Sequence, residues 1–340
     1  RIPAHFCGVH GLKPTSGRLS NDDFPSDLLG SGQEVFIPQP GPIARTVGDL
    51  QLAMALFAGT SMKITNDLVP PVPGPDPMSV QLEGMRIGMY TDNGYFQAAP
   101  ALRRAVEEAA DALRKRGAIV EPFTPPDVAE AMRIFLGSVS AGGGKDYKRL
   151  LGDEKPIPQV AGLFQGTWSQ PLALPIVAAI TGARGQDHLA HAIRNMGARS
   201  TEEYWALVEA RNRYRARFHQ ALDEGLFEAI LCPPFATPAV RHGASEHLLP
   251  AATYALVYNV LGAPAGVVSL TRVRPGEESD REASKDMADI TARNVEHGSA
   301  GLPVAVQVVA RHWREDIVLA LMAALEDQFR TTPDYPAHPD

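Results

Sequence analysis

Stretches with apolar residues at helical spacing alternate along the chain with short runs that are mainly apolar. Between Pro100 and Gly117 the apolar residues fall three or four positions apart, which predicts an amphipathic helix. Its predicted core face consists of Leu102, Val106, Ala109 and Leu113. Apolar runs before and after it, at residues 85–90 and 118–123, predict two strands. Together they form a strand–helix–strand unit, the pattern of an α/β protein.

Capping signals place two more helices. Thr46 stands three residues before Asp49, and Ser200 stands three residues before Glu203, each at the start of an apolar-periodic segment. The remaining predicted elements are buried strands at residues 229–232 and 302–310 and a final amphipathic helix from about Trp313.

Residues 248–271 contain no charged side chain. This length exceeds the roughly 18 apolar residues that suggest a membrane span. Glycines and prolines, including Gly262 and Pro264, nevertheless argue against a continuous spanning helix. The pattern instead predicts a buried helix to about Leu261, a turn, and a buried strand.

Composition narrows the class of protein. The chain has 340 residues, 44% of them hydrophobic and 21% charged, which is typical of a folded globular protein. Lys and Arg number 32 against 39 Asp and Glu, so no nucleic-acid partner is expected. Two cysteines, Cys7 and Cys232, are too few for a disulfide framework, and a reducing, cytoplasmic location is expected.

Familiar ligand-binding and catalytic motifs are incomplete. The glycine run at residues 141–145 is not a phosphate-binding loop, because Val139 occupies the first glycine position and Asp146 follows the lysine. Cys-x-x-His at residues 7–10 and His-x-x-His at residues 188–191 each lack a second ligand pair, so no metal site is predicted. Neither Gly-x-Ser-x-Gly nor Ser-x-x-Lys occurs.

Four sequence elements, in order along the chain, together resemble the amidase signature family. They are RIPxxFCGVxGLKPTxGRLS at residues 1–20, GPIAR at 41–45, YNVLGAPAG at 258–266 and GLPVAVQ at 301–307. Within that family the likeness is greatest to the fatty acid amide hydrolase-type amidases, through residues 91–93 followed by 100–106, residues 254–268 and residues 301–310.

The resemblance implies a fold and a reaction. The implied fold is α/β, with a mixed, mostly parallel sheet flanked by helices. Residues 1–340 would form the C-terminal larger part of an amidase signature domain that is incomplete at its N-terminus. The implied reaction is amide hydrolysis by a Ser–cis-Ser–Lys triad, without a cofactor, on a small-molecule amide. The nucleophilic serine is expected two positions before Arg1, and the bridging serine and the lysine further upstream. None of these roles can be reassigned to Ser16, Ser20 or Lys13, so the chain alone is predicted to be inactive.

Supporting site residues are also implied. Arg1 and Cys7 would support the nucleophile loop, Arg1 through charge-assisted hydrogen bonds and Cys7 as a small packed side chain. Candidate substrate-pocket residues are Asn259, Gly262, Pro264, Gly266, Val267 and Val268. Strand alternation allows only one of the two valines to face a substrate.

Residues 160–200 are a candidate apolar cap insertion. Their segment 168–180 is rich in apolar residues but too short to span a bilayer. It is either a core or homodimer-contact helix, or a cap that makes peripheral membrane contact. Two alternatives to the hydrolase stay open: the amidase-type subunit of a glutaminyl- or asparaginyl-tRNA amidotransferase, and a non-catalytic amidase-fold fragment.

Overall fold

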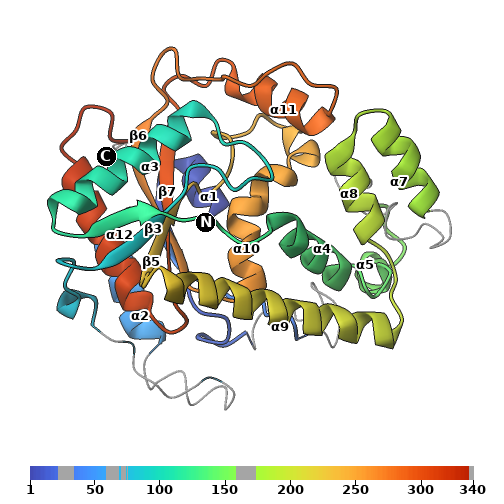
Figure 1. Ribbon diagram of the computed structural model, residues 1–340, viewed down its shortest axis with the longest axis horizontal. Coiled ribbons are helices and arrows are strands. Elements are labelled where there is room, and N and C mark those ends of the chain that lie inside the picture. The colour runs from blue at the N-terminus through green and yellow to red at the C-terminus, as the bar shows by residue number, and fades with distance from the viewer. Residues whose placement is uncertain (22–33, 59–68, 70–73, 75, 158–173, 337–340) are drawn as a thin grey trace.

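A seven-stranded sheet organises the chain in the order β2-β1-β6-β7-β5-β3-β4 (Figure 1). The computed structural model describes residues 1–21, 34–58, 69, 74, 76–157 and 174–336. The strands are β1 (His10–Lys13), β2 (Ile43–Ala44), β3 (Arg86–Met89), β4 (Ile119–Pro122), β5 (Ala229–Cys232), β6 (Ala265–Arg272) and β7 (Pro303–Ala310).

Strand directions confirm a mixed sheet but correct its predicted balance. β3 runs parallel to β4 and to β5, whereas β1–β2, β1–β6, β6–β7 and β5–β7 are antiparallel. The sheet is therefore mostly antiparallel, and the prediction of a mostly parallel sheet was wrong. The long central strands β6 and β7 are buried on both faces, so their apolar runs carry no information on strand direction.

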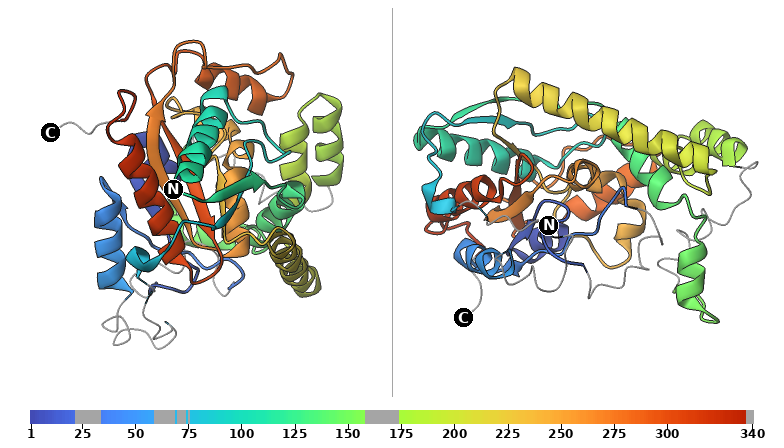
Figure 2. Two further views of the ribbon diagram at one scale, coloured as in Figure 1. Left: turned by 60° about the vertical axis from the view of Figure 1, so that its left-hand side comes forward. Right: turned by 90° about the horizontal axis from the view of Figure 1, so that it is seen from below.

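Helices cover both faces of the sheet. They are α1 (Ile2–Cys7), α2 (Val47–Phe57), α3 (Pro100–Lys115), α4 (Val128–Val139), α5 (Lys145–Leu151), α7 (Leu174–Ala183), α8 (Asp187–Asn195), α9 (Thr201–Glu224), α10 (Thr253–Leu261), α11 (Met287–Glu296) and α12 (Glu315–Phe329), with 3-10 turns at Pro77–Ser79, Ala244–His247 and Pro250–Ala252. α3 and α12 pack on β6 and β7, and α2 packs on α12. On the opposite face, α1 packs on β1, β6 and β7, while α10 contacts α4 and α9 (Figures 1 and 2).

The predicted helix starts are confirmed. The Thr46 hydroxyl accepts a 3.1 Å hydrogen bond from the Asp49 backbone N–H. Ser200 and Glu203 form a reciprocal capping box, and Pro100 opens α3. Each cap satisfies backbone N–H groups that the helix itself leaves unpaired.

The uncharged stretch lies in the interior, as predicted. α10 ends at Leu261, Gly262 closes it with a left-handed φ of 76°, and β6 follows at the centre of the sheet. Among the described residues, no helix is long and apolar enough to cross a membrane.

The candidate cap region is described only from Leu174 onward; residues 158–173 lie outside the described part. Within α7 only Ala178 is buried, and Ile176, Val177 and Ile180 are exposed. α7 is therefore not a core helix. Homodimer contact and membrane contact both stay predictions.

Candidate active site

The chain begins near the centre of the molecule (Figure 2). Residues of α10 and β7 hold the side chain of Arg1 there. One guanidinium nitrogen, Nη1, donates to the Ala255 carbonyl at 3.0 Å and to Gln307 Oε1 at 2.8 Å. The other, Nη2, donates to Asn259 Oδ1. Burial lowers the pKa of the guanidinium from 12.5 to about 10, so it stays charged at neutral pH. Three acceptors therefore fix the position and orientation of a cation.

The orientation of the Gln307 side-chain amide is fixed by its own hydrogen bonds, and this orientation directs its oxygen to Arg1. Its Nε2 donates to the Tyr254 carbonyl at 2.9 Å and to Cys232 Sγ at 3.3 Å, which leaves Oε1 facing the guanidinium. The residue is fully buried in β7. Sequence reasoning did not assign Gln307 to the site, although it is the one polar residue in the strand sequence PVAVQVVA. A lone buried amide in an apolar strand needs a partner, and this is the signal that could have identified it.

A pocket of about 360 Å³, here called the Arg1 pocket, opens beside this clamp. It is lined by Arg1, Leu12, Lys13, Ser16, Phe36, Ile37, Pro38, Gln39, Gly41, Ile43, Phe135, Val139 and Asn259. Its volume is near the lower end of the range of small-molecule sites. Its lining combines polar residues, among them Arg1, Lys13 and Asn259, with apolar side chains from α4 and the segment before β2. The pocket can therefore hold a ligand with one polar end.

Lys13 contributes an amine with unusual properties to this pocket. Burial, together with the nearby charge of Arg1, lowers the pKa of Lys13 well below its usual range. Its Nζ donates to the Pro14 carbonyl at 2.7 Å. Ser16 also lines the pocket, and its backbone N–H donates to the Gly262 carbonyl at 3.0 Å. Gly262 thus fixes the turn beneath the pocket through its backbone.

The other predicted pocket residues lie deeper. A Cβ at Gly266 would stand 2.1 Å from Met322 Sδ, so this side of β6 packs directly on α12. Val267 pairs with Gln307 and therefore shares the sheet face of the Arg1 clamp. Val268 returns to the face of α12, and both valines are fully buried. Neither valine lines the Arg1 pocket. Pro264, also predicted as a pocket residue, accepts a hydrogen bond at its carbonyl from the Ala310 N–H at 3.3 Å.

The Cys–His and His–His pairs do not converge on a ligand. Cys7 is exposed at the end of α1, so the prediction that it is a small packed side chain was wrong. His10, in contrast, is buried with Nε2 3.1 Å from Glu326 Oε1. His188 and His191 both pack edge-on against Tyr95. Over the described residues, no cluster of three or more His, Cys, Asp or Glu side chains is placed to hold a metal ion.

A second, mainly apolar pocket of about 290 Å³ lies on the neighbouring face of α4. Its apolar residues include Tyr95, Met132, Leu136, Leu189, Ala192, Ile193, Met196, Leu249 and Met287. Because Phe135 and Val139 line the Arg1 pocket while Met132 and Leu136 line this one, α4 forms the wall between them.

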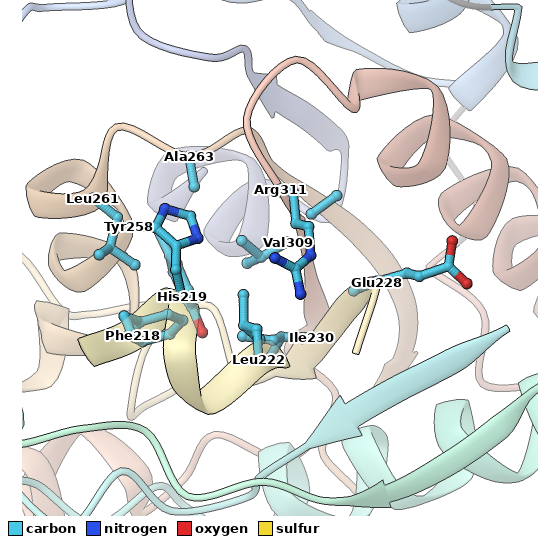
Figure 3. Close-up of a pocket in the computed structure, with 12 residues that line it drawn as sticks. Phe218, His219, Leu222, Glu228, Ile230, Tyr258, Leu261, Ala263, Val309 and Arg311 are labelled. Carbon is cyan, nitrogen blue, oxygen red and sulfur yellow. The ribbon is translucent and has the colours of Figure 1, made fainter. Parts of the chain in front are cut away.

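Figure 3 shows a smaller void between α9 and the sheet, with His219, Arg311 and Val309 above Leu222 and Ile230. Its volume is about 10 Å³, hardly enough for one water molecule. This void is a packing defect, and a substrate cannot enter it.

The comparisons with known proteins agree with the resemblance. A family model described as Amidase matches residues 1–319, and the chain belongs to the amidase family. Fatty-acid amide hydrolase 1 of Sus scrofa is 30% identical over 96% of this chain and 56% of its own length. Fatty acid amide hydrolase 1 of Caenorhabditis elegans is 27% identical over 96% of this chain and 57% of its own.

A solved structure titled fatty acid amide hydrolase shares the fold, with a TM-score of 0.79, at 20% identity over 97% of this chain and 54% of that one. A glutamyl-tRNA(Gln) amidotransferase subunit of Acidobacterium capsulatum is also related, at 26% identity over 96% of this chain and 62% of its own. The chain thus spans a little over half the length of the curated relatives it matches.

Proposed function

We propose that the chain belongs to an enzyme that hydrolyses acyl amides to a carboxylic acid and an amine, and that the Arg1 pocket is its reaction site. The observation that carries the proposal is the three-acceptor clamp on Arg1 beside a pocket that has both polar and apolar lining residues. Family membership supports the same reaction class. In this proposal the Arg1 clamp fixes the position of the backbone next to the nucleophile loop.

The proposed mechanism is the Ser–cis-Ser–Lys route that the resemblance implies. An upstream lysine, kept neutral by desolvation, takes a proton through the bridging serine from the nucleophilic serine two positions before Arg1. The serine oxygen attacks the amide carbon, and backbone N–H groups of the nucleophile loop stabilise the oxyanion. The amine leaves with a proton, and water then hydrolyses the acyl ester. Arg1 and its acceptors position this loop and take no proton.

An apolar acyl or aryl group is the proposed substrate preference. The apolar side chains that line the Arg1 pocket, among them Leu12, Phe36 and Phe135, support such a group at the proposed reaction site. The two fatty acid amide hydrolases among the relatives support this preference by their names.

The proposed function is tested by amide hydrolysis assays on two proteins: residues 1–340, and the same chain preceded by the residues that its gene encodes before Arg1. A long-chain acyl amide and an aryl amide serve as substrates. We expect turnover only by the extended protein, since no residual binding energy replaces a missing nucleophile. Comparable turnover by both proteins would place the nucleophile within residues 1–340.

The amidotransferase is the second candidate, supported by the relative from Acidobacterium capsulatum. An enzyme component of this kind passes ammonia to a partner, so its activity on simple amides should require that partner. Rapid hydrolysis of acyl amides by the isolated extended protein favours the hydrolase. Inactivity that is relieved by a co-purifying partner favours the amidotransferase, and inactivity under every condition favours a non-catalytic fold.

A further inference from the structure

A groove on the outer side of α4 is lined by four arginines. It has a volume of about 440 Å³ and lies where α4 meets α8 and α9. The arginines come from four different segments: Arg133 from α4, Arg194 from α8, Arg199 from the α8–α9 connection and Arg213 from α9. One carboxylate, that of Glu203, lines the groove with them.

Few acidic side chains of the protein pair with the arginines of this groove. Glu203 is engaged in capping its own helix, where it accepts a hydrogen bond from the Ser200 N–H at 2.8 Å. Arg213 pairs with Glu209, and Arg199 donates to the Asn195 carbonyl at 2.9 Å. Arg133 and Arg194 have no ion pair or side-chain hydrogen bond to any residue that the structure describes.

Such a cluster is unexpected in this chain. Acidic residues outnumber Lys and Arg by 39 to 32, so carboxylates were available to neutralise the groove. Arg133 is half-buried, which makes an unpaired charge there unfavourable. The positive field extends to His191 on α8, whose pKa is lowered by burial first and by Arg194 and Arg133 in addition. The groove therefore carries an excess of positive charge.

We propose that this groove is a binding site for a phosphate-bearing anion. Guanidinium groups present paired N–H donors that match phosphate oxygens, and four of them converging from separate elements suit a ligand with more than one negative charge. The phosphate could belong to a free small molecule or to a lipid headgroup, since both present the same oxygens. The site does not depend on the proposed hydrolase reaction.

The test uses the full protein as its gene encodes it and inorganic phosphate as the probe. Binding is measured by calorimetric titration at constant ionic strength, with chloride as the competing anion. We expect saturable phosphate binding in the wild type and a loss of at least about tenfold in affinity in the double variant Arg133→Gln/Arg194→Gln. The matched control is Arg45→Gln/Arg293→Gln, which removes the same charge from two exposed positions outside the groove and should bind phosphate as the wild type does.

A second arm distinguishes the two phosphate sources. Phosphatidylcholine vesicles with about one-fifth phosphatidic acid are sedimented with each protein, in the presence and absence of free phosphate. Groove-dependent sedimentation that phosphate competes away indicates a headgroup ligand. Phosphate binding without such sedimentation indicates a free small anion. Both outcomes support the site.

The proposal is overturned if phosphate does not bind saturably and vesicles do not bind through the groove, or if the control variant loses as much affinity as the groove variant. Should the groove variant fail to fold, phosphate protection of wild-type arginines from phenylglyoxal answers the question by peptide mapping. Selective protection of Arg133 and Arg194 supports the site, and uniform modification contradicts it.

Discussion

Gln307 on β7 accepts a 2.8 Å hydrogen bond from the guanidinium of Arg1, which is 306 positions away in the chain. The opposite end of the same amide donates to the Tyr254 carbonyl on α10. A single side chain therefore joins the first residue, the central strand and the helix beside the Arg1 pocket.

Replacing Gln307 with Met should destabilise the protein. Met fills a similar volume but makes neither the hydrogen bond to Arg1 Nη1 nor the one to the Tyr254 carbonyl. We expect the free energy of unfolding to fall by about 1–3 kcal/mol. Urea unfolding measures this. Gln328→Met, at an exposed position on α12, is the control and should change stability by less than about 0.5 kcal/mol. Equal stabilities of the two variants would show that the Gln307 amide contributes nothing.

Arg1→Lys in the extended protein should lower kcat more than it raises KM. A lysine ammonium lacks the planar donor fork that reaches Ala255, Gln307 and Asn259 together, so the nucleophile loop loses its fixed position. We expect a loss of roughly tenfold or more in kcat, because small misplacements of reacting groups are costly. A rise in KM alone would assign Arg1 to substrate binding instead.

The helices could be predicted from the sequence because their signals are local. The spacing of Leu102 and Val106, the proline at position 100 and the Ser200–Glu203 capping box each depend on residues within one or two turns. Strand direction depends on how distant segments meet, and the buried strands β6 and β7 look the same in either direction. This explains why the balance of the sheet was predicted incorrectly.

The candidate site was only partly predictable for the same reason. The resemblance brought Arg1 and Asn259 into consideration, and the structure places them in contact. Gln307 could be identified only as a buried polar residue whose partner was unknown. The choice between Val267 and Val268 required the register of β6 against β7, which no local pattern encodes.

That register makes the acyl-pocket prediction specific. Val267 is fully buried and outside the Arg1 pocket, but Val267→Phe should push the layer of Gln307 and Arg1 towards that pocket. We therefore expect it to lower kcat/KM for long acyl amides more than for short ones. Val268→Phe enlarges the opposite face and should mainly destabilise the fold, by about 1–3 kcal/mol. An acyl-length series with melting curves separates the two effects. Flat length dependence in both variants would identify both valines as ordinary core residues.

His5 should make stability depend on pH. Its ring accepts a hydrogen bond from the Ala305 N–H at Nδ1 and contacts the Thr237 carbonyl through Nε2, which requires the neutral form with the proton on Nε2. Burial lowers its pKa from 6.5 to about 4. The unfolded chain therefore binds this proton first, so the contribution of His5 is complete above pH 6.5 and is lost as the pH falls towards 4.

The loss should reach about 3 kcal/mol at full protonation. His5→Gln keeps an acceptor and a donor but does not titrate, so its unfolding free energy should fall less steeply between pH 6.5 and 4 than that of the wild type. His242→Gln, at an exposed position, is the control and should retain the wild-type slope. Parallel curves for His5→Gln and the wild type would exclude this role.

The most direct test of the proposed function is to map the residue that a fluorophosphonate probe modifies in the extended protein. The probe forms a covalent bond with an activated serine oxygen, and mass spectrometry of the peptides identifies the serine. We predict a single adduct on the serine two positions before Arg1, formed in step with the loss of amide hydrolysis. An adduct within residues 1–340, or complete inactivation with that upstream serine unmodified, would contradict the proposed function.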